Sequence, residues 1–483
     1  MELLDIALIK KKSIKGIIAL TSRTFALQVV AFSATFLLTI FLSPAIFGVF
    51  YVVSAIISFL GYFSDIGLAA ALIQKKEELS QDDLKTTFTI QQALVGAVVV
   101  FSLLFSYHIA QFYRLDDAGL WLLRSLIISF FLSSLKTIPS VLLERKLEFH
   151  KLVIPQILET VSFYIVAVVL AWSGWGVTSF TWAVLTRGIV GLASMYMVSP
   201  WQIQIGIVKG EAKKLLKFGL PFQLNSFLAL IKDDLLTVFL GKILSFSEIG
   251  YIGWAKKWAE VPLRLILDSV VRVTFPAFSR LQHSKEVLGK ALDNTVFALA
   301  FTMFPMTVVL LYFVSPMVHI VPRYAKWEPA LLSFYLLGVT AAIAGLSTPL
   351  TNALNAVGKI SITLWLMVLW VTTTWLGTVI FIHLFGFLGF SIALFGVAAG
   401  TILLVVKLTQ TVAPFSFVRC IISPLLGSVV QGSLYQLFFS GSPYSIPRLI
   451  SGGFVGVILY GGVVWLMDQK RIQHLFMSIR TSV

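Results

Sequence analysis

Five charged side chains recur at every fourth position within one long apolar stretch of this sequence. They are Lys256, Glu260, Arg264, Asp268 and Arg272, and their signs alternate. Residues four apart lie on one face of an α-helix, so a helix over 250–275 places all five along one winding polar stripe. Such charges either pair with one another or line a water-filled cavity that holds an anion. The excess of cations favours the cavity, and Pro262 is expected to kink the helix.

Further ionisable side chains fall inside apolar stretches that are long enough to cross a bilayer. A cation at mid-bilayer costs roughly 2.5–3.5 kcal/mol, so these residues are expected to face a wet interior or an acid partner. Arg187 and Glu159 can pair with each other, whereas Lys136 is expected to reach the membrane surface. The cations expected to hold an anionic substrate are Arg23, Arg264, Lys256, Arg187 and Arg272. The residues expected to couple an ion or to pair charges are Asp65, Lys232, Asp233, Asp234, Glu260 and Asp268.

The elements that must position these residues are transmembrane helices. The chain has 483 residues, of which 58% are hydrophobic and 12% charged, against about 25% charged in a typical soluble protein. This excludes a soluble enzyme and a disordered chain. Hydropathy predicts an all-α polytopic membrane protein with about 14 spans, among them 17–41, 217–241 and 250–275.

No catalytic, cofactor or metal site is expected. The single cysteine excludes a disulfide framework and a cysteine-based metal site, and the six histidines are dispersed along the chain. There is no P-loop, no dinucleotide fingerprint and no Ser/His/Asp grouping. These absences predict that the chain is not an enzyme.

The basic residues outside the spans predict the orientation. With a cytoplasmic N-terminus, 22 of them lie in inner segments and 5 in outer loops. By the positive-inside rule, both termini are then cytoplasmic. The protein is expected to lie in the inner membrane. The net charge of +15 is therefore a topology signal, and we expect no nucleic-acid partner.

Two six-helix lobes are expected, because the chain carries a weak internal repeat. An offset of 202 residues aligns Ser43 and Gly48 with Ser245 and Gly250. Six helices per repeat imply a pseudo-twofold axis along the membrane normal, with a cleft between the lobes. We predict an N-terminal lobe over 1–200, a linker with a short amphipathic segment over 201–216, a second lobe over 217–410, and two extra helices with a basic tail over 411–483.

Three stretches resemble the polysaccharide transporter family, the O-antigen-type flippases of the multidrug/oligosaccharidyl-lipid/polysaccharide superfamily. They are FGVFYVVSAIISFLGYFSDIGLAAALIQKKE from residue 47, LLERKLEFHKL from residue 142, and GYIGWAKKWAEVPLRLILDSVVRVTFPAFSRLQ from residue 250. The resemblance implies an inverted-V fold that moves polyprenyl-pyrophosphate-linked oligosaccharide to the outer leaflet by alternating access, for cell-surface polysaccharide biosynthesis. It implies cavity roles for Arg23 and Arg264, a lipid-tail groove beside the two extra helices, and membrane lipids, a glycan polymerase and other assembly proteins as partners.

Other functions fit the same sequence features. A lipid II-type peptidoglycan precursor flippase would share the fold and the cationic cavity. A related multidrug exporter would share the fold, but it should have a surplus of cavity acids. A non-transporting scaffold would require the charges within the spans to pair internally.

Overall fold

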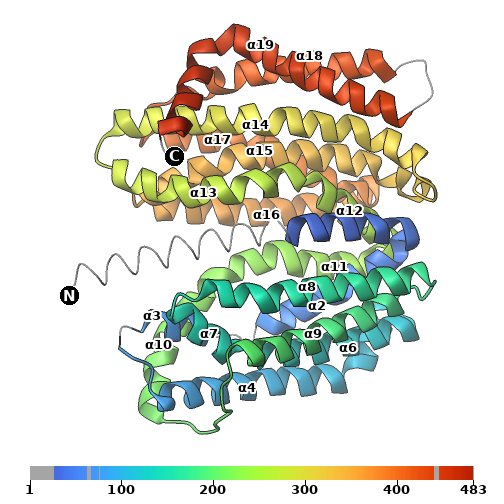
Figure 1. The fold of residues 1–483 in the computed structure, drawn as a ribbon, viewed down its shortest axis with the longest axis vertical. Coiled ribbons are helices and arrows are strands. Elements are labelled where there is room, and N and C mark those ends of the chain that lie inside the picture. Colours follow the sequence, from blue (N-terminus) through green and yellow to red (C-terminus); the bar gives the residue numbers. More distant parts are fainter. Residues whose placement is uncertain (1–26, 63–66, 76, 440–444, 482–483) are drawn as a thin grey trace. The chain divides into compact units, whose positions relative to one another are not determined.

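Every regular element in the described part of the chain is a helix. The computed structural model describes residues 27–62, 67–75, 77–439 and 445–481, and for some residues in these ranges only the backbone. The chain divides into two compact units, Met1–Gly250 and Tyr251–Val483 (Figure 1). The all-helical fold predicted from composition is confirmed for these residues.

The described part of the first unit begins with the helix Leu27–Phe41. The elements that follow are α2 (Pro44–Tyr62), α3 (Leu68–Gln74), α4 (Gln81–Leu104), α5 (Ser106–Tyr113), α6 (Asp117–Ser134), α7 (Thr137–Arg145), α8 (Phe149–Trp172), α9 (Thr178–Val198), α10 (Lys209–Leu230), a π-helical turn η1 (Ile231–Leu235) and α11 (Leu236–Ile243). Helices α8 and α9 pack along one another, α6 packs against α9 and α2, and α10 packs against α3 and α4. The start of α12 (Phe246–Ala259) completes this unit.

The second unit is built around one long helix. Its elements after α12 are α13 (Val261–Leu281), α14 (Lys285–Ile320), a 3-10 turn η2 (Ala325–Ala330), α15 (Leu331–Ala356), α16 (Ile360–Phe385), α17 (Leu388–Gln410), α18 (Phe417–Phe439) and α19 (Ile446–Thr481). Helix α14 packs against α13, α15 and α18, and α18 packs against α19 (Figure 1). The buried side chains of Leu292, Val296 and Met303 on α14 form the centre of this core.

Eleven helices in the described residues are long and apolar enough to cross a bilayer, which makes the chain a multi-pass membrane protein. The total of 14 stays a prediction. The three other predicted spans are 17–41, 217–241 and 250–275. The first span lies partly outside the described residues. The second is divided into α10, η1 and α11, and in the third α12 ends at Ala259 and α13 begins at Val261.

The predicted linker contains a stretch without regular secondary structure, followed by the first turns of a helix. The amides of Gly206 and Val208 donate to the hydroxyls of Thr89 and Thr86 on α4, at 2.9 and 3.0 Å. Helix α10 then begins at Lys209. The lobes predicted over 1–200 and 217–410 and the extra helices over 411–483 stay predictions.

Candidate functional site

The charged stripe is divided between two helices at Glu260, which lies between α12 and α13. Pro262 occupies the first turn of α13, where its missing N–H costs nothing. Hydrogen bonds between residues four apart continue across the junction, from the Glu260 amide to the Lys256 carbonyl at 3.1 Å and from the Arg264 amide to the Glu260 carbonyl at 2.9 Å. The predicted i, i+4 register is therefore preserved from Lys256 to Arg264.

Glu260 and Arg264 form an ion pair within this stripe. The Glu260 carboxylate accepts from Nη2 of Arg264 at 2.8 Å and from Nε at 3.3 Å. The Arg264 side chain nevertheless remains 55% exposed, against 22% for Glu260. A guanidinium has five N–H donors in a planar fork, so Glu260 orients this group and leaves donors for another anion.

The other predicted site residues differ in how far the structure describes them. Lys256 is half-buried on α12, and Asp234 is half-buried in η1. Arg23 and Asp65 lie outside the described residues. The side chains of Lys232, Asp233, Asp268 and Arg272 also lie outside what the structure describes, although their helix backbones are defined. The structure therefore brings together Glu260 and Arg264 from the predicted set, and the remaining groupings stay predictions.

A second group of charges lies inside the first unit, around Glu159 on α8. One carboxylate oxygen of Glu159 contacts Nζ of Lys136, and the other lies 3.9 Å from Nε of Arg187 on α9. The side chains of Lys136 and Glu159 are each 13% exposed, whereas Arg187 is 56% exposed. The expected pairing of Arg187 with Glu159 is present, but Lys136 binds this acid instead of reaching out of the membrane.

Gly191 on α9 makes room for this charge cluster. A Cβ atom at this position would overlap the carboxylate of Glu159. Sequence reasoning missed both the role of Gly191 and the Lys136–Glu159 pair, because their partners come from different helices and no local spacing marks them.

A third charged network joins α3, α4 and α10 at one end of the first unit. Nζ of Lys75 binds Asp83 at 2.7 Å and Glu211 at 3.3 Å, and the Asp83 side chain is fully buried. The hydrogen bond to Asp83 raises the pKa of Lys75. Arg145 donates to the carbonyls of Leu72 and Lys75, at 2.7 and 2.6 Å. These bonds satisfy carbonyls that the end of α3 leaves without helical partners.

Two glycines mark a close crossing of α2 and α12. A Cβ atom at Gly48 would overlap the carbonyl oxygen of Phe246, and one at Gly250 would overlap the carbonyl oxygen of Pro44. All four residues belong to the first unit. The two contacts are equivalent under the 202-residue offset of the internal repeat, so the repeat found in the sequence corresponds to a reciprocal contact.

No group of three or more His, Cys, Asp or Glu side chains among the described residues is placed to hold a metal ion. The described charges instead form ion pairs and exposed guanidinium groups. Guanidinium groups bind carboxylates and phosphates through paired hydrogen bonds, so this chemistry suits an anionic ligand.

Comparison with known proteins gives concordant results. Residues 37–331 match a family model described as "Polysaccharide biosynthesis protein". The succinoglycan biosynthesis transport protein ExoT of Rhizobium meliloti is 24% identical over 465 residues, covering 90% of this chain and 89% of ExoT. The lipid II flippase MurJ in an inward closed conformation superposes with a TM-score of 0.71 at 13% identity, covering 91% of this chain and 99% of MurJ. A multidrug resistance MATE transporter of the MOP superfamily superposes with a TM-score of 0.63 at 14% identity, covering 78% of this chain and 94% of the transporter.

Proposed function

The chain belongs to the polysaccharide biosynthesis protein family, and from this premise we propose that it is a flippase for polyprenyl-pyrophosphate-linked oligosaccharide. It moves this substrate from the cytoplasmic to the outer leaflet for cell-surface polysaccharide biosynthesis. The similarity to ExoT, a transport protein of succinoglycan biosynthesis, supports the substrate class. The fold shared with MurJ supports a transporter rather than an enzyme.

The observation that carries the proposal is the state of Arg264. This cation lies within an apolar stretch, pairs with Glu260 through part of its fork, and keeps more than half of its side chain exposed. A lipid-facing cation at mid-bilayer would cost roughly 2.5–3.5 kcal/mol. We infer that Arg264 faces water and binds the pyrophosphate together with Arg23, Lys256, Arg187 and Arg272.

Alternating access is the proposed mechanism. The reciprocal contacts of Gly48 and Gly250 support a twofold relation between α2 and α12, which correspond to the second predicted span of each repeat. Helices in such close contact can rock as rigid bodies about the crossing while the substrate changes sides. In this mechanism the two six-helix lobes, 1–200 and 217–410, move against each other.

Ion coupling is assigned to the charges on η1 and α13. The π-helical turn η1 carries Lys232, Asp233 and Asp234, and π-helical turns are frequent at functional sites. We propose that these residues, with Asp65, Glu260 and Asp268, bind a coupling ion or exchange partners during transport. For the orientation, we propose that both termini are cytoplasmic, as the positive-inside count predicts.

Native mass spectrometry of the purified protein in mild detergent tests this function. We expect a co-purifying phosphorylated polyprenyl species, depleted in Arg264→Ala but retained in Arg280→Ala, which removes an exposed arginine from the same helix. The mass of the attached glycan would separate an oligosaccharide from a peptidoglycan precursor. Ordinary phospholipids alone, bound equally by all three proteins, would contradict the proposal.

A further inference from the structure

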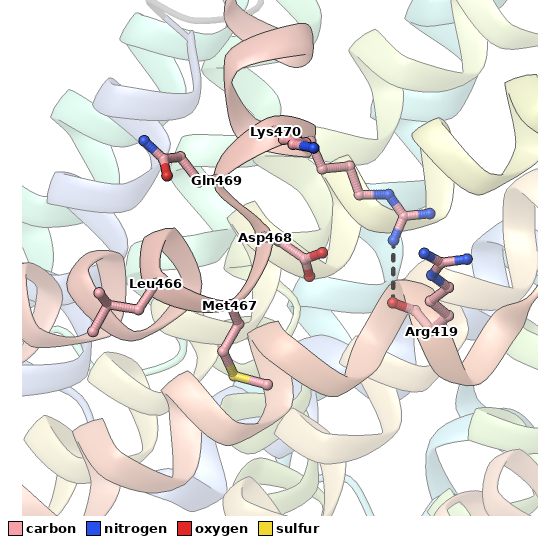
Figure 2. Close-up of a pocket in the computed structure, with 7 residues that line it drawn as sticks. Arg419, Leu466, Met467, Asp468, Gln469 and Lys470 are labelled. Atoms are coloured by element: carbon pink, nitrogen blue, oxygen red, sulfur yellow. Dashed lines mark hydrogen bonds between the residues drawn. The ribbon is translucent and has the colours of Figure 1, made fainter.

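A cavity of about 590 Å³ lies where α19 kinks beside the start of α18. Asp468 has φ −133° and ψ 38°, so its backbone leaves the helical conformation within α19. The lining includes Arg419 from α18 and Leu466, Met467, Asp468, Lys470 and Arg471 from α19. Figure 2 shows Asp468 and Arg419 on the same side of the α19 backbone. The volume is within the range of about 300–1,000 Å³ typical of small-ligand sites.

The charges of this cavity are predominantly positive. Its one carboxylate, Asp468, accepts a hydrogen bond from the hydroxyl of Ser423, which is buried. Among the described residues, no hydrogen bond or ion pair engages the guanidinium of Arg419 or the ammonium of Lys470, and both residues are exposed. Two cations with available donors therefore face a cavity whose only acid already has a partner.

Arg471 is held in place by its surroundings. It donates to the carbonyl of Arg419 at 3.1 Å, and its guanidinium lies 4.9 Å from the ring centre of Phe297. Figure 2 shows the bond to the Arg419 carbonyl as a dashed line. A guanidinium fixed in this way retains further N–H donors without having to lose side-chain freedom on binding.

Apolar side chains continue from this cavity along the two helices. Leu466 and Met467 are 85% and 47% exposed at the kink. Val418 and Ile422, next to Arg419 on α18, are 69% and 39% exposed. Since α18 and α19 are both apolar enough to cross a bilayer, these side chains are positioned to contact acyl chains beside the cationic cavity.

We propose that this cavity binds the phosphate headgroup of an anionic membrane phospholipid, with its acyl chains along α18. Basic pockets between membrane helices bind anionic lipid headgroups by pairing cations with phosphate oxygens. The pairing of phosphate-binding cations with exposed apolar side chains favours a lipid over a soluble phosphate. This site is distinct from the stripe at Arg264 and goes beyond the proposed transport activity.

The test compares lipid retention in the full chain. The protein is reconstituted in nanodiscs of phosphatidylcholine with one-fifth phosphatidylglycerol, and lipids bound after extraction into detergent are measured by native mass spectrometry. The variant is Arg419→Gln with Lys470→Gln, which leaves the described bonds of Arg471 and Asp468 intact. The matched control is Lys359→Gln with Lys407→Gln, which removes the same charge from exposed positions on the same predicted membrane side.

We expect phosphatidylglycerol binding to weaken about thirtyfold in the Arg419/Lys470 variant and to be unchanged in the control. Each cation near the membrane surface contributes roughly 1 kcal/mol to lipid binding, and about 1.4 kcal/mol corresponds to a tenfold change in Kd. Equal retention by all three proteins would overturn the proposal. Inorganic phosphate and glycerol 3-phosphate provide the soluble arm. If either displaced the lipid at micromolar concentration, the site would be one for a free phosphate and the lipid assignment would be wrong.

Discussion

Gly48 and Gly250 lie at equivalent positions of the internal repeat. Each glycine is in close contact with the backbone four residues before the other glycine. The carbonyl of Phe246 occupies the space of a Cβ at Gly48, and the carbonyl of Pro44 occupies that space at Gly250. Glycine allows two helices to approach until their backbones touch. Any larger residue at either position must push α2 and α12 apart.

Alanine at either glycine is therefore expected to destabilise the protein. Overpacking a close contact typically costs about 1–3 kcal/mol, and here the neighbouring atom is backbone and cannot move aside. We expect Gly48→Ala and Gly250→Ala to lower the melting temperature in detergent by several degrees. Because both act on one contact, the double variant should lose less stability than the sum of the two.

Gly96→Ala is the matched control, because a Cβ at this helical glycine would have nothing within 4 Å. In an open helical position alanine is favoured over glycine by roughly 1 kcal/mol. A melting temperature of Gly48→Ala equal to that of Gly96→Ala would show that the α2–α12 contact is not close.

The buried pair of Lys136 and Glu159 gives a second prediction. Removing one partner of a buried pair typically costs about 3–5 kcal/mol, because the other charge is left without a counterion. Glu159→Ala should therefore lower stability strongly. Lys136→Met combined with Glu159→Leu should recover most of that loss, since both charges are removed. Arg187→Ala is the control, because its side chain is 56% exposed and lies 3.9 Å from Glu159. A double variant no more stable than Glu159→Ala would contradict the pairing.

Lys75, the residue that follows α3, gives a third prediction, including a pH dependence. Lys75→Ala leaves the buried Asp83 with its bonds from Ser80 alone, and a weakened buried acceptor costs about 1–3 kcal/mol. Lys85→Ala breaks a pair between a half-buried lysine and the exposed Asp82 and should cost less than about 1 kcal/mol. Chemical denaturation in detergent measures both losses, and equal losses would count against the Lys75 network.

The sign of the pH effect follows from the pKa of Lys75, which hydrogen bonding to Asp83 raises above 10.5. A raised pKa means that the stabilisation is complete below the unfolded value and is lost as the pH rises through the folded one. The stability difference between the native protein and Lys75→Ala should thus stay constant from pH 7 to pH 9. A decline within that window would indicate another titrating group.

The sequence predicted those features that depend on local spacing. Glu260 and Arg264 are four residues apart, so helical geometry alone brings them together, and Pro262 marks the break between α12 and α13. The repeat that pairs Gly48 with Gly250 was visible as a weak alignment. The Lys136–Glu159 pair joins the turn between α6 and α7 to α8 and depends on space at Gly191, which no spacing indicates. The kink at Asp468 lies between Met467 and Gln469, with no proline or glycine beside it to signal a break.

Export in cells that carry only the variant gene tests the role of Arg264. We expect Arg264→Ala, and likewise Arg23→Ala, to abolish surface polysaccharide while expression remains normal, because a lost charge-assisted phosphate contact cannot be replaced by a methyl group. Arg264→Lys should retain part of the export, since it keeps the charge but loses the bidentate fork. Arg280→Ala should export normally.

If the Glu260–Arg264 pair were only structural, Arg264→Ala would lose thermal stability and Arg264→Lys would recover stability and export together. Full export from both alanine variants would remove these two arginines from the mechanism.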